Sequence, residues 1–151
     1  MYEAILLPLD GSELSERAIP HAAAVARRFD SRLVVLRVVV PIIGPGDLAY
    51  GPNPYTYQSL LEAETRAAQE YVARKAEELR AQGLRAEGVC RTGEPATSIV
   101  DFAAESDAKL VVIATHGRSG VARWVFGSVA TRVLQGAQVP VLLIRAALPQ
   151  A

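Results

Sequence analysis

Short apolar runs alternate with longer amphipathic segments along this chain. The apolar runs cover residues 4–9, 33–40, 110–114 and 139–145, and residues 84–91 alternate between apolar and polar positions. An uninterrupted short run is typical of a strand buried on both faces, whereas alternation indicates a half-exposed strand near a sheet edge. The pattern predicts an α/β fold, with a single doubly wound, five-stranded parallel sheet and helices on both faces.

Helical stripes fill the intervals between the predicted strands. After the first strand, apolar residues recur every three or four positions, and Ser12 is a suitable N-cap. This pattern predicts one helix of about five turns, bent at Pro20 because proline removes one donor from the helical ladder. A last helix is predicted over residues 128–137, with Ser128 as its cap.

One long connection, residues 41–58, interrupts the order of strands and helices. It is rich in proline, glycine and tyrosine, a composition that resists regular structure. Loops of this length are usually functional or disordered, so a flap over a site and a loose insertion are both open interpretations. A capping box of Ser59 and Glu62 then predicts a long helix that ends near Gln82, before Gly83.

Composition narrows the classes of function. The chain has 151 residues, sixteen of them basic and sixteen acidic, so one domain over residues 1–147 with a short tail at 148–151 is expected. A balanced charge supplies no positive field that would gather nucleic acid. Cys90 is the single cysteine and there are two histidines, which makes an internal disulfide impossible and a metal cluster improbable. Cys90 is best interpreted as a small hydrophobic residue in a strand.

No segment suggests a membrane or an export signal. The first residues lack a basic leader followed by an apolar core, and the apolar runs are far shorter than the ~20 residues that span a bilayer. These observations predict a cytoplasmic protein that does not bind membranes.

Two segments bring unusual chemistry to the carboxyl ends of the predicted strands. Pro8, Leu9 and Asp10 end the first strand, while Gly117, nine further residues and then Gly127 and Ser128 follow the fourth. Ligands of open parallel sheets bind beyond these strand ends. Glycine lets a phosphate approach the backbone, and the first amides of a helix form an anion site. The residues therefore indicate a phosphate-bearing ligand.

The chain resembles the universal stress protein family over nearly its whole length. The resemblance rests on the ILLPLDGS opening, the LRVV of the second strand, the glycine spacing that ends in Gly127 and Ser128, and the PVLLIR of the last strand. The nucleotide-binding branch of the family has glycine, two residues, glycine, nine residues, glycine, then serine or threonine. Ala114 stands at the first glycine of that pattern, and one methyl group is expected to weaken binding or leave it unchanged.

The resemblance implies a doubly wound fold, a bound adenine nucleotide, usually ATP, and a dimer joined through the last strand at 139–145. Pro8 and Asp10 would line the nucleoside, and the Val38 backbone would meet the adenine. Mg²⁺ could be held by Asp10 through a water. The full set of nucleotide-binding residues implied in this way is Pro8, Leu9, Asp10, Val38, Ala114, Gly117, Gly127, Ser128 and Val129.

Each of these features has a simpler explanation as well. Glycines at a strand end can be ordinary turn residues, and Asp10 can cap the first helix. His116 can contact a phosphate, act as a base or do neither. Within the segment between the glycines, the arginines can neutralise phosphates or be solvated, and the aromatic residues more often pack or meet a partner: Arg118, Arg123, Trp124 and Phe126.

Parts for phosphoryl transfer are scarce in the sequence. There is no G-x-x-x-x-G-K-[ST] loop, and the only lysines, Lys75 and Lys109, are distant from the glycines. A nucleotide-binding regulatory dimer that hydrolyses ATP slowly or not at all is therefore favoured. A nucleotide hydrolase or transferase and a nucleotide-free interaction module remain the alternatives. The last strand also leaves an apolar edge that self-pairing would cover.

Overall fold

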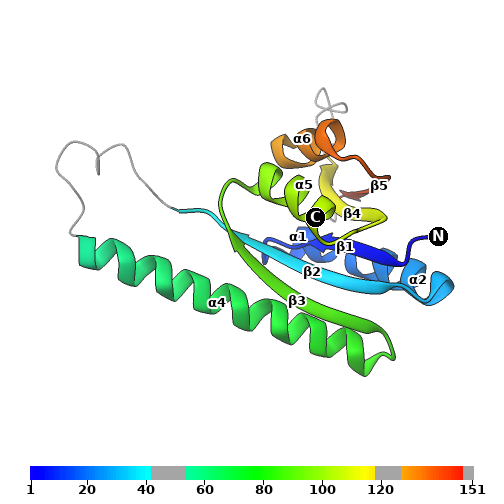
Figure 1. Ribbon diagram of the computed structural model, residues 1–151, viewed down its shortest axis with the longest axis horizontal. Helices are drawn as coiled ribbons and strands as arrows, with labels where there is room; N and C mark the ends of the chain where they lie inside the picture. The colour runs from blue at the N-terminus through cyan, green and yellow to red at the C-terminus, as the bar shows by residue number, and fades with distance from the viewer. Residues whose placement is uncertain (42–53, 118–126, 148–151) are drawn as a thin grey trace.

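The computed structural model describes residues 1–41, 54–117 and 127–147, and its elements follow the predicted order (Figure 1). The five strands form one parallel sheet in the order β3-β2-β1-β4-β5, which is the doubly wound arrangement that the pattern predicts. The strands are β1 (Ala4–Pro8), β2 (Arg32–Val39), β3 (Arg85–Thr92), β4 (Leu110–Gly117) and β5 (Val141–Ala147). The half-exposed strand β3 lies at one edge, as its alternation predicts, and β5 lies at the other.

Helices cover both faces of the sheet. Buried side chains of α2 (Ile19–Phe29) and α4 (Pro54–Ala81) pack in one apolar cluster with β1 and β2. Buried side chains of α5 (Pro95–Glu105) and α6 (Ser128–Gly136) pack in a second cluster on the other face. Figure 1 shows α5 and α6 together on one side of the strands and α4 on the other. Two separate cores therefore hold the central strands between them.

The segment after β1 forms two helices, so the prediction of one bent helix is wrong. The short α1 (Glu13–Glu16) begins at Ser12, whose hydroxyl accepts a hydrogen bond from the Ser15 amide as predicted. The chain then leaves the helical ladder, and α2 begins at Ile19 with Pro20 in its first turn. Proline fits a first turn because its missing N–H has no helical partner there. The ring of Pro20 thus starts a new helix instead of bending an existing one.

Helix α4 also departs from the prediction, because it begins at Pro54 and includes the last residues of the expected 41–58 loop. Ser59 and Glu62 lie inside α4 and do not form a capping box. Its end agrees with the sequence: Gly83 follows with a φ of 82°, and the Leu84 amide donates to the Leu79 carbonyl. The rest of the predicted loop, residues 42–53, lies outside the described residues.

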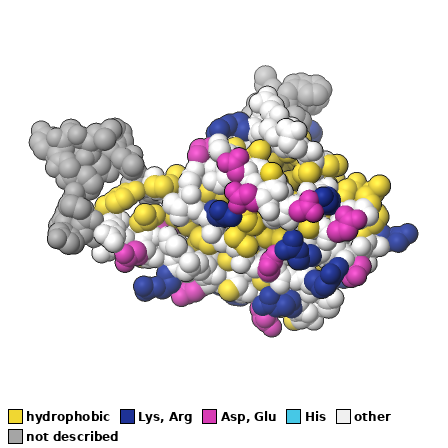
Figure 2. Space-filling view, viewed as in Figure 1, with side chains coloured by type: hydrophobic (Ala, Val, Ile, Leu, Met, Phe, Trp, Pro, Cys, Tyr) yellow, Lys and Arg dark blue, Asp and Glu magenta, His cyan; other side chains and the backbone are white. Residues whose placement is uncertain are grey.

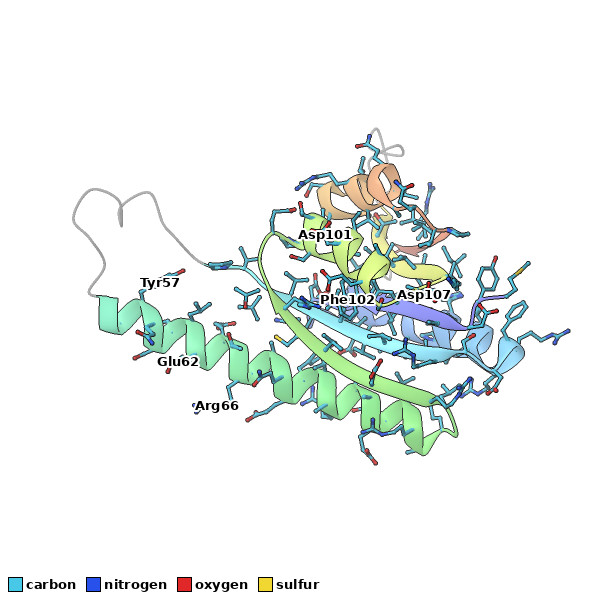
Figure 3. All side chains as sticks on the ribbon, viewed as in Figure 1. Tyr57, Glu62, Arg66, Asp101, Phe102 and Asp107 are labelled. Atoms are coloured by element: carbon cyan, nitrogen blue, oxygen red, sulfur yellow. The ribbon has the colours of Figure 1, made fainter. Side chains whose placement is uncertain are left out.

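The exposed surface mixes both signs of charge. Lys and Arg side chains are interspersed with Asp and Glu on the face in Figure 2, without a continuous region of either sign. Along α4, Glu62 and Arg66 point away from the sheet (Figure 3). Within the described part of the chain, no helix is both long and apolar enough to cross a membrane.

Candidate functional site

The carboxyl ends of β1 and β4 separate at the centre of the sheet. The two strands pair only at Ile5 with Leu110 and at Leu6 with Val111, whereas β4 and β5 pair along seven residues of each strand. Donors alternate between the two sides of a strand, and the Leu9 amide donates to β2. The missing N–H of Pro8 is therefore the one that would face β4. Pro8 ends the β1–β4 ladder and opens a crevice where the order of the strands reverses.

A cavity of about 600 Å³ lies at this crevice. Its volume falls within the range of small-molecule sites, roughly 300–1,000 Å³. Residues from the ends of β1, β2 and β4 line it, together with residues of α1, α4, α5 and α6. Eight of the nine residues that the sequence nominates are among its lining: Pro8, Leu9, Asp10, Val38, Ala114, Gly127, Ser128 and Val129. The ninth, Gly117, ends β4 opposite Ala147.

The loop after β1 fixes the Asp10 carboxylate at one side of the cavity. Asp10 Oδ1 accepts a hydrogen bond from the Ser12 amide at 2.8 Å, and the Asp10 amide donates to Ser15 Oγ at 3.3 Å. Burial raises the pKa of Asp10, but hydrogen bonds with Ser12 and Ser15 and the charge of Arg37 outweigh it, so the pKa lies below its usual value. Asp10 is therefore an ionised acceptor near neutral pH.

The backbone of Val38 faces the cavity beyond the end of β1. The Leu36 carbonyl accepts from the Leu9 amide of the neighbouring strand end, whereas the Val39 carbonyl accepts from Gly93 on the opposite side. Because backbone groups alternate along a strand, those of Val38 point to the same side as those of Leu36. On that side β1 ends at Pro8, and the chain turns at Asp10 before it reaches the level of Val38. Val38 thus offers one donor and one acceptor to a ligand.

Helix α6 begins at the cavity without a side-chain cap. Gly127 is its N-cap residue, and Ser128 is its first helical residue, so the prediction that Ser128 caps the helix is wrong. Gly127 adopts φ 80° and ψ 150°, a backbone region that essentially only glycine occupies. Its carbonyl accepts from the Thr131 amide and hydroxyl. In the described residues no side chain accepts from the first amides of α6, whose first two residues, Ser128 and Val129, line the cavity.

The first amides of α5, unlike those of α6, donate hydrogen bonds to a side chain of this protein, the Glu94 carboxylate. The Glu94 carboxylate accepts from the amides of Ala96 and Thr97 at 3.2 and 2.8 Å, and from Arg132 Nη1 at 2.7 Å. The Thr97 hydrogen bonds, with those of Ala96 and the Arg132 charge, lower the pKa of Glu94 to about 2. An anion is therefore excluded from α5, although Pro95 in its first turn also lines the cavity.

Ala114, which stands where the family pattern has glycine, lies in β4 opposite Ile144. It is half-buried and forms part of the cavity lining. The next residue, Thr115, is buried and lines the cavity too, and it was not nominated from the sequence. A Cβ on Gly127 would lie 3.8 Å from Thr115 Oγ1, so this threonine backs the turn into α6. The side chain of His116 and residues 118–126, with Arg118, Arg123, Trp124 and Phe126, lie outside the described part of the site.

Sequence reasoning also missed the role of Arg37 and of α4 in the site. Arg37 interrupts an apolar strand, a pattern that predicts a side chain directed toward solvent or a partner, and it is half-buried at the cavity with its guanidinium over the Tyr71 ring of α4. Glu64 of α4 lines the cavity as well, and no pattern in the sequence indicated it. Cys90, the cross-strand neighbour of Arg37, is half-buried in β3.

A doubly wound sheet with a cavity at its switch point, lined by the Asp10 carboxylate and by the start of α6, defines an α/β protein with a cavity at its strand ends. The sequence model of the universal stress protein family matches residues 1–145. A universal stress protein of Methanocaldococcus jannaschii is 34% identical over 148 residues, which cover 96% of this chain and 83% of that protein. The chain belongs to the universal stress protein family.

Solved structures agree with this assignment. The universal stress protein UspA from Lactobacillus plantarum matches with a TM-score of 0.78 and 24% identity, over 95% of this chain and 98% of that one. A universal stress protein from Archaeoglobus fulgidus, solved in complex with dAMP, matches with a TM-score of 0.60 and 25% identity, over 95% and 98% of the two chains. The first comparison supports the fold, and the second adds a relative with a bound adenine nucleotide.

Proposed function

We propose that this protein binds an adenine nucleotide, ATP with Mg²⁺, in the strand-end cavity and acts as a regulatory protein of the stress response. The observation that carries the proposal is the pair of unlike ends of the cavity. At one end lie the Val38 backbone and the Asp10 carboxylate, and at the other lie Gly127 and the first amides of α6. The dAMP complex of the Archaeoglobus fulgidus relative supports the same ligand class.

Each part of a nucleotide finds a chemical complement in this arrangement. The donor and acceptor of one backbone residue match the Watson–Crick edge of adenine, which also presents one acceptor and one donor. The Asp10 carboxylate accepts hydrogen bonds and therefore suits the hydroxyls of ribose. The amides of Ser128 and Val129 at the start of α6 suit the phosphates. Gly117 at the end of β4 completes the proposed phosphate end.

Mg²⁺ in this proposal is held mainly by the phosphates and by water. Among the described residues, no group of three or more His, Cys, Asp or Glu side chains could hold a metal ion. Mg²⁺ usually keeps several waters and needs only one or two carboxylates besides phosphate oxygens. Asp10 is the carboxylate that we assign to this contact, through a bound water.

A thermal melt tests the proposal. ATP at a hundred times its dissociation constant should add about 2.7 kcal/mol to the free energy of unfolding. For a chain of this size, that corresponds to a rise in Tm of roughly 5–10 °C. Mass analysis of the small molecules released from the freshly purified, denatured protein should also detect an adenine nucleotide. An unchanged Tm in millimolar MgATP, with no nucleotide released, would overturn the proposal.

Binding without rapid hydrolysis is the second part of the proposal. In the described lining, the charged side chains are Asp10, Arg37 and Glu64, and neither a lysine nor a base held by a second carboxylate is present for phosphoryl transfer. We expect single nucleotides to remain intact over many minutes with the purified protein. Multiple turnovers that disappear in Gly127→Trp would assign the cavity to a hydrolase instead.

We also propose that two copies pair through β5. This strand lies at the edge of the sheet, and Leu142 on it is 36% exposed. An apolar edge of this kind invites pairing with another strand, and a two-fold axis lets one surface cover its own copy. Light scattering should give a dimer mass at micromolar concentration, and Leu142→Lys should shift it toward the monomer. A monomer mass for the wild type would contradict the pairing.

A further inference from the structure

The cavity proposed to receive a polyanion carries two carboxylates in its described lining. Asp10 lies after β1, and Glu64 lies on α4. Both are exposed side chains, and both would repel the phosphates of a nucleotide that enters the cavity. Arg37 is the one positively charged side chain among the described residues of the lining. Its charge therefore decides how much repulsion an incoming nucleotide meets.

The guanidinium of Arg37 has two neighbours in the described structure, the Tyr71 ring and Gly11. Its Cζ lies 5.3 Å from the centroid of the Tyr71 ring, at the distance of a cation–π contact. The guanidinium also lies against Gly11, where an added Cβ would clash with Nη1. Gly11 has a φ of 84°, which also favours glycine. A glycine at this position leaves room for the guanidinium beside the Asp10 loop.

Tyr71 is itself anchored below Arg37. Its hydroxyl donates to Glu16 Oε1 at 2.8 Å, and Lys75 Nζ lies 3.3 Å from Glu16 Oε2. Burial, together with the Glu16 hydrogen bond and charge, raises the pKa of Tyr71, so the ring stays neutral. The Tyr71 ring, which contacts the guanidinium, therefore belongs to α4 and is also hydrogen-bonded to α1 through Glu16. No hydrogen bond or ion pair joins the guanidinium to another described residue, so its donors remain available at the cavity.

We propose that Arg37 determines the preference of this cavity for phosphorylated nucleosides over uncharged nucleosides. The inference rests on the proposed nucleotide site and names a residue that sets its specificity. Arg37 lies in β2, which is separated from β4 by β1, whereas the proposed phosphate amides follow β4 at the start of α6. Arg37 therefore acts on the phosphates through its charge, by offsetting Asp10 and Glu64, and the effect grows with the number of phosphates.

Isothermal titration of adenosine, AMP and ATP into the full-length protein and its variants tests the inference. At low ionic strength, Arg37→Gln should weaken ATP binding about tenfold and AMP binding about threefold, and leave adenosine binding unchanged. Arg37→Lys keeps the positive charge but loses the planar group stacked on Tyr71, so it should bind ATP within about threefold of the wild type and clearly more tightly than Arg37→Gln. Raising NaCl from about 50 mM to about 500 mM should shrink the difference between Arg37→Gln and the wild type.

Two charge variants act as matched controls. Glu64→Gln removes one negative charge from the lining and should strengthen ATP binding about twofold to threefold, with adenosine unchanged. Arg27→Gln removes a positive charge from α2, where Arg27 bonds to Gln82 outside the cavity lining, and should change neither affinity. Circular dichroism melts of all variants report whether each is folded.

The outcomes separate the inference from the function on which it rests. Equal losses for adenosine and ATP in Arg37→Gln would show that Arg37 positions the nucleoside, which overturns the inference. Unchanged ATP affinity in Arg37→Gln would overturn it as well, and so would an Arg37→Lys variant as weak as Arg37→Gln. A wild-type protein that binds none of the three ligands would overturn the proposed function instead.

Discussion

Helices α5 and α6 cover the same face of the sheet and both begin at the cavity, yet their first turns are opposite in chemistry. The Glu94 carboxylate accepts hydrogen bonds from the first amides of α5, and Glu94 is itself the N-cap residue of that helix. Gly127 has no side chain to offer the amides of α6. Every helix start carries partial positive charge, so the difference lies in whether the chain supplies its own acceptor.

The two helix starts are also linked. Arg132 of α6 donates to the Glu94 carboxylate at 2.7 Å, so the cap of α5 also anchors the body of α6. This contact holds the uncapped end of α6 against the cavity without filling it. Both side chains of this ion pair are about half-exposed, so it contributes only modestly to the packing of the two helices.

Supplying an acceptor to α6 should produce the largest effect. Ser128→Asp places a carboxylate on the first residue of α6, where it interacts favourably with the helix dipole and competes with the nucleotide. We expect ATP affinity to fall at least about tenfold while Tm stays the same or rises. Ser128→Asn has nearly the same shape without the charge, and it should bind within about threefold of the wild type. Equal affinities of Ser128→Asp and Ser128→Asn would contradict the role of these amides.

Replacing Gly127, the N-cap residue of α6, should lower the free energy of unfolding. Gly127→Ala puts a side chain at φ 80° and ψ 150°, and such strain costs about 1–3 kcal/mol in the free energy of unfolding. A Cβ there meets Thr115 at an ordinary contact distance, so the strain comes from the backbone alone. Chemical denaturation should show the loss, and Ser128→Ala at the exposed neighbouring position is the control. An unchanged free energy of unfolding in Gly127→Ala would show that the backbone at residue 127 adopts another conformation without strain.

Removing the cap of α5 should lower stability in a way that depends on pH. The pKa of Glu94 is about 2 in the folded protein, below its ordinary value of 4.5. A lowered pKa contributes stability above 4.5, and that contribution is lost as pH falls from 4.5 toward 2. Thermal melts of Glu94→Gln should therefore show a Tm a few degrees below the wild type near pH 7, with the gap closing near pH 2. A gap that stays constant with pH would contradict an ionic cap.

Restoring the glycine of the family pattern should have the smallest effect. Ala114 lies in the extended strand β4, where no unusual dihedral requires glycine. Ala114→Gly should lower the free energy of unfolding by roughly 0.5–1 kcal/mol, because glycine weakens a strand interior. We expect ATP affinity to change by less than about threefold, measured by titration. A gain of about tenfold or more would show that the methyl group of Ala114 obstructs the nucleotide.

The sequence predicted the sheet and the edge of it that carries the cavity. Four apolar runs and one alternating segment identified the five strands, and residues 8–10 together with Gly127 and Ser128 marked the segments that line the cavity. The Ser12 cap of α1 was predicted correctly, but the starts of α2 and α4 and the cap of α6 were not. Serine is statistically the better cap than glycine, but the backbone at residue 127 is one that serine rarely adopts. Tertiary geometry decided between the two residues.

Arg37 shows a second limit of the sequence. An arginine within an apolar strand predicts a side chain directed toward solvent or a partner, but the pattern does not say which residues surround it. Its partners, Gly11 and Tyr71, come from segments far away along the chain: the pairing of β1 with β2 brings Gly11 to Arg37, and the packing of α4 against β2 and β3 brings Tyr71. Contacts of this kind depend on three-dimensional register and leave no local pattern.

The central claim is that the first amides of α6 bind the phosphates of an adenine nucleotide. Amide NMR of the labelled protein, titrated in parallel with adenosine and AMP, tests it most directly. The Ser128 and Val129 amides should shift strongly with AMP and little with adenosine, whereas Val38 should shift with both. Saturation with AMP while the Ser128 and Val129 signals stay in place would contradict the claim.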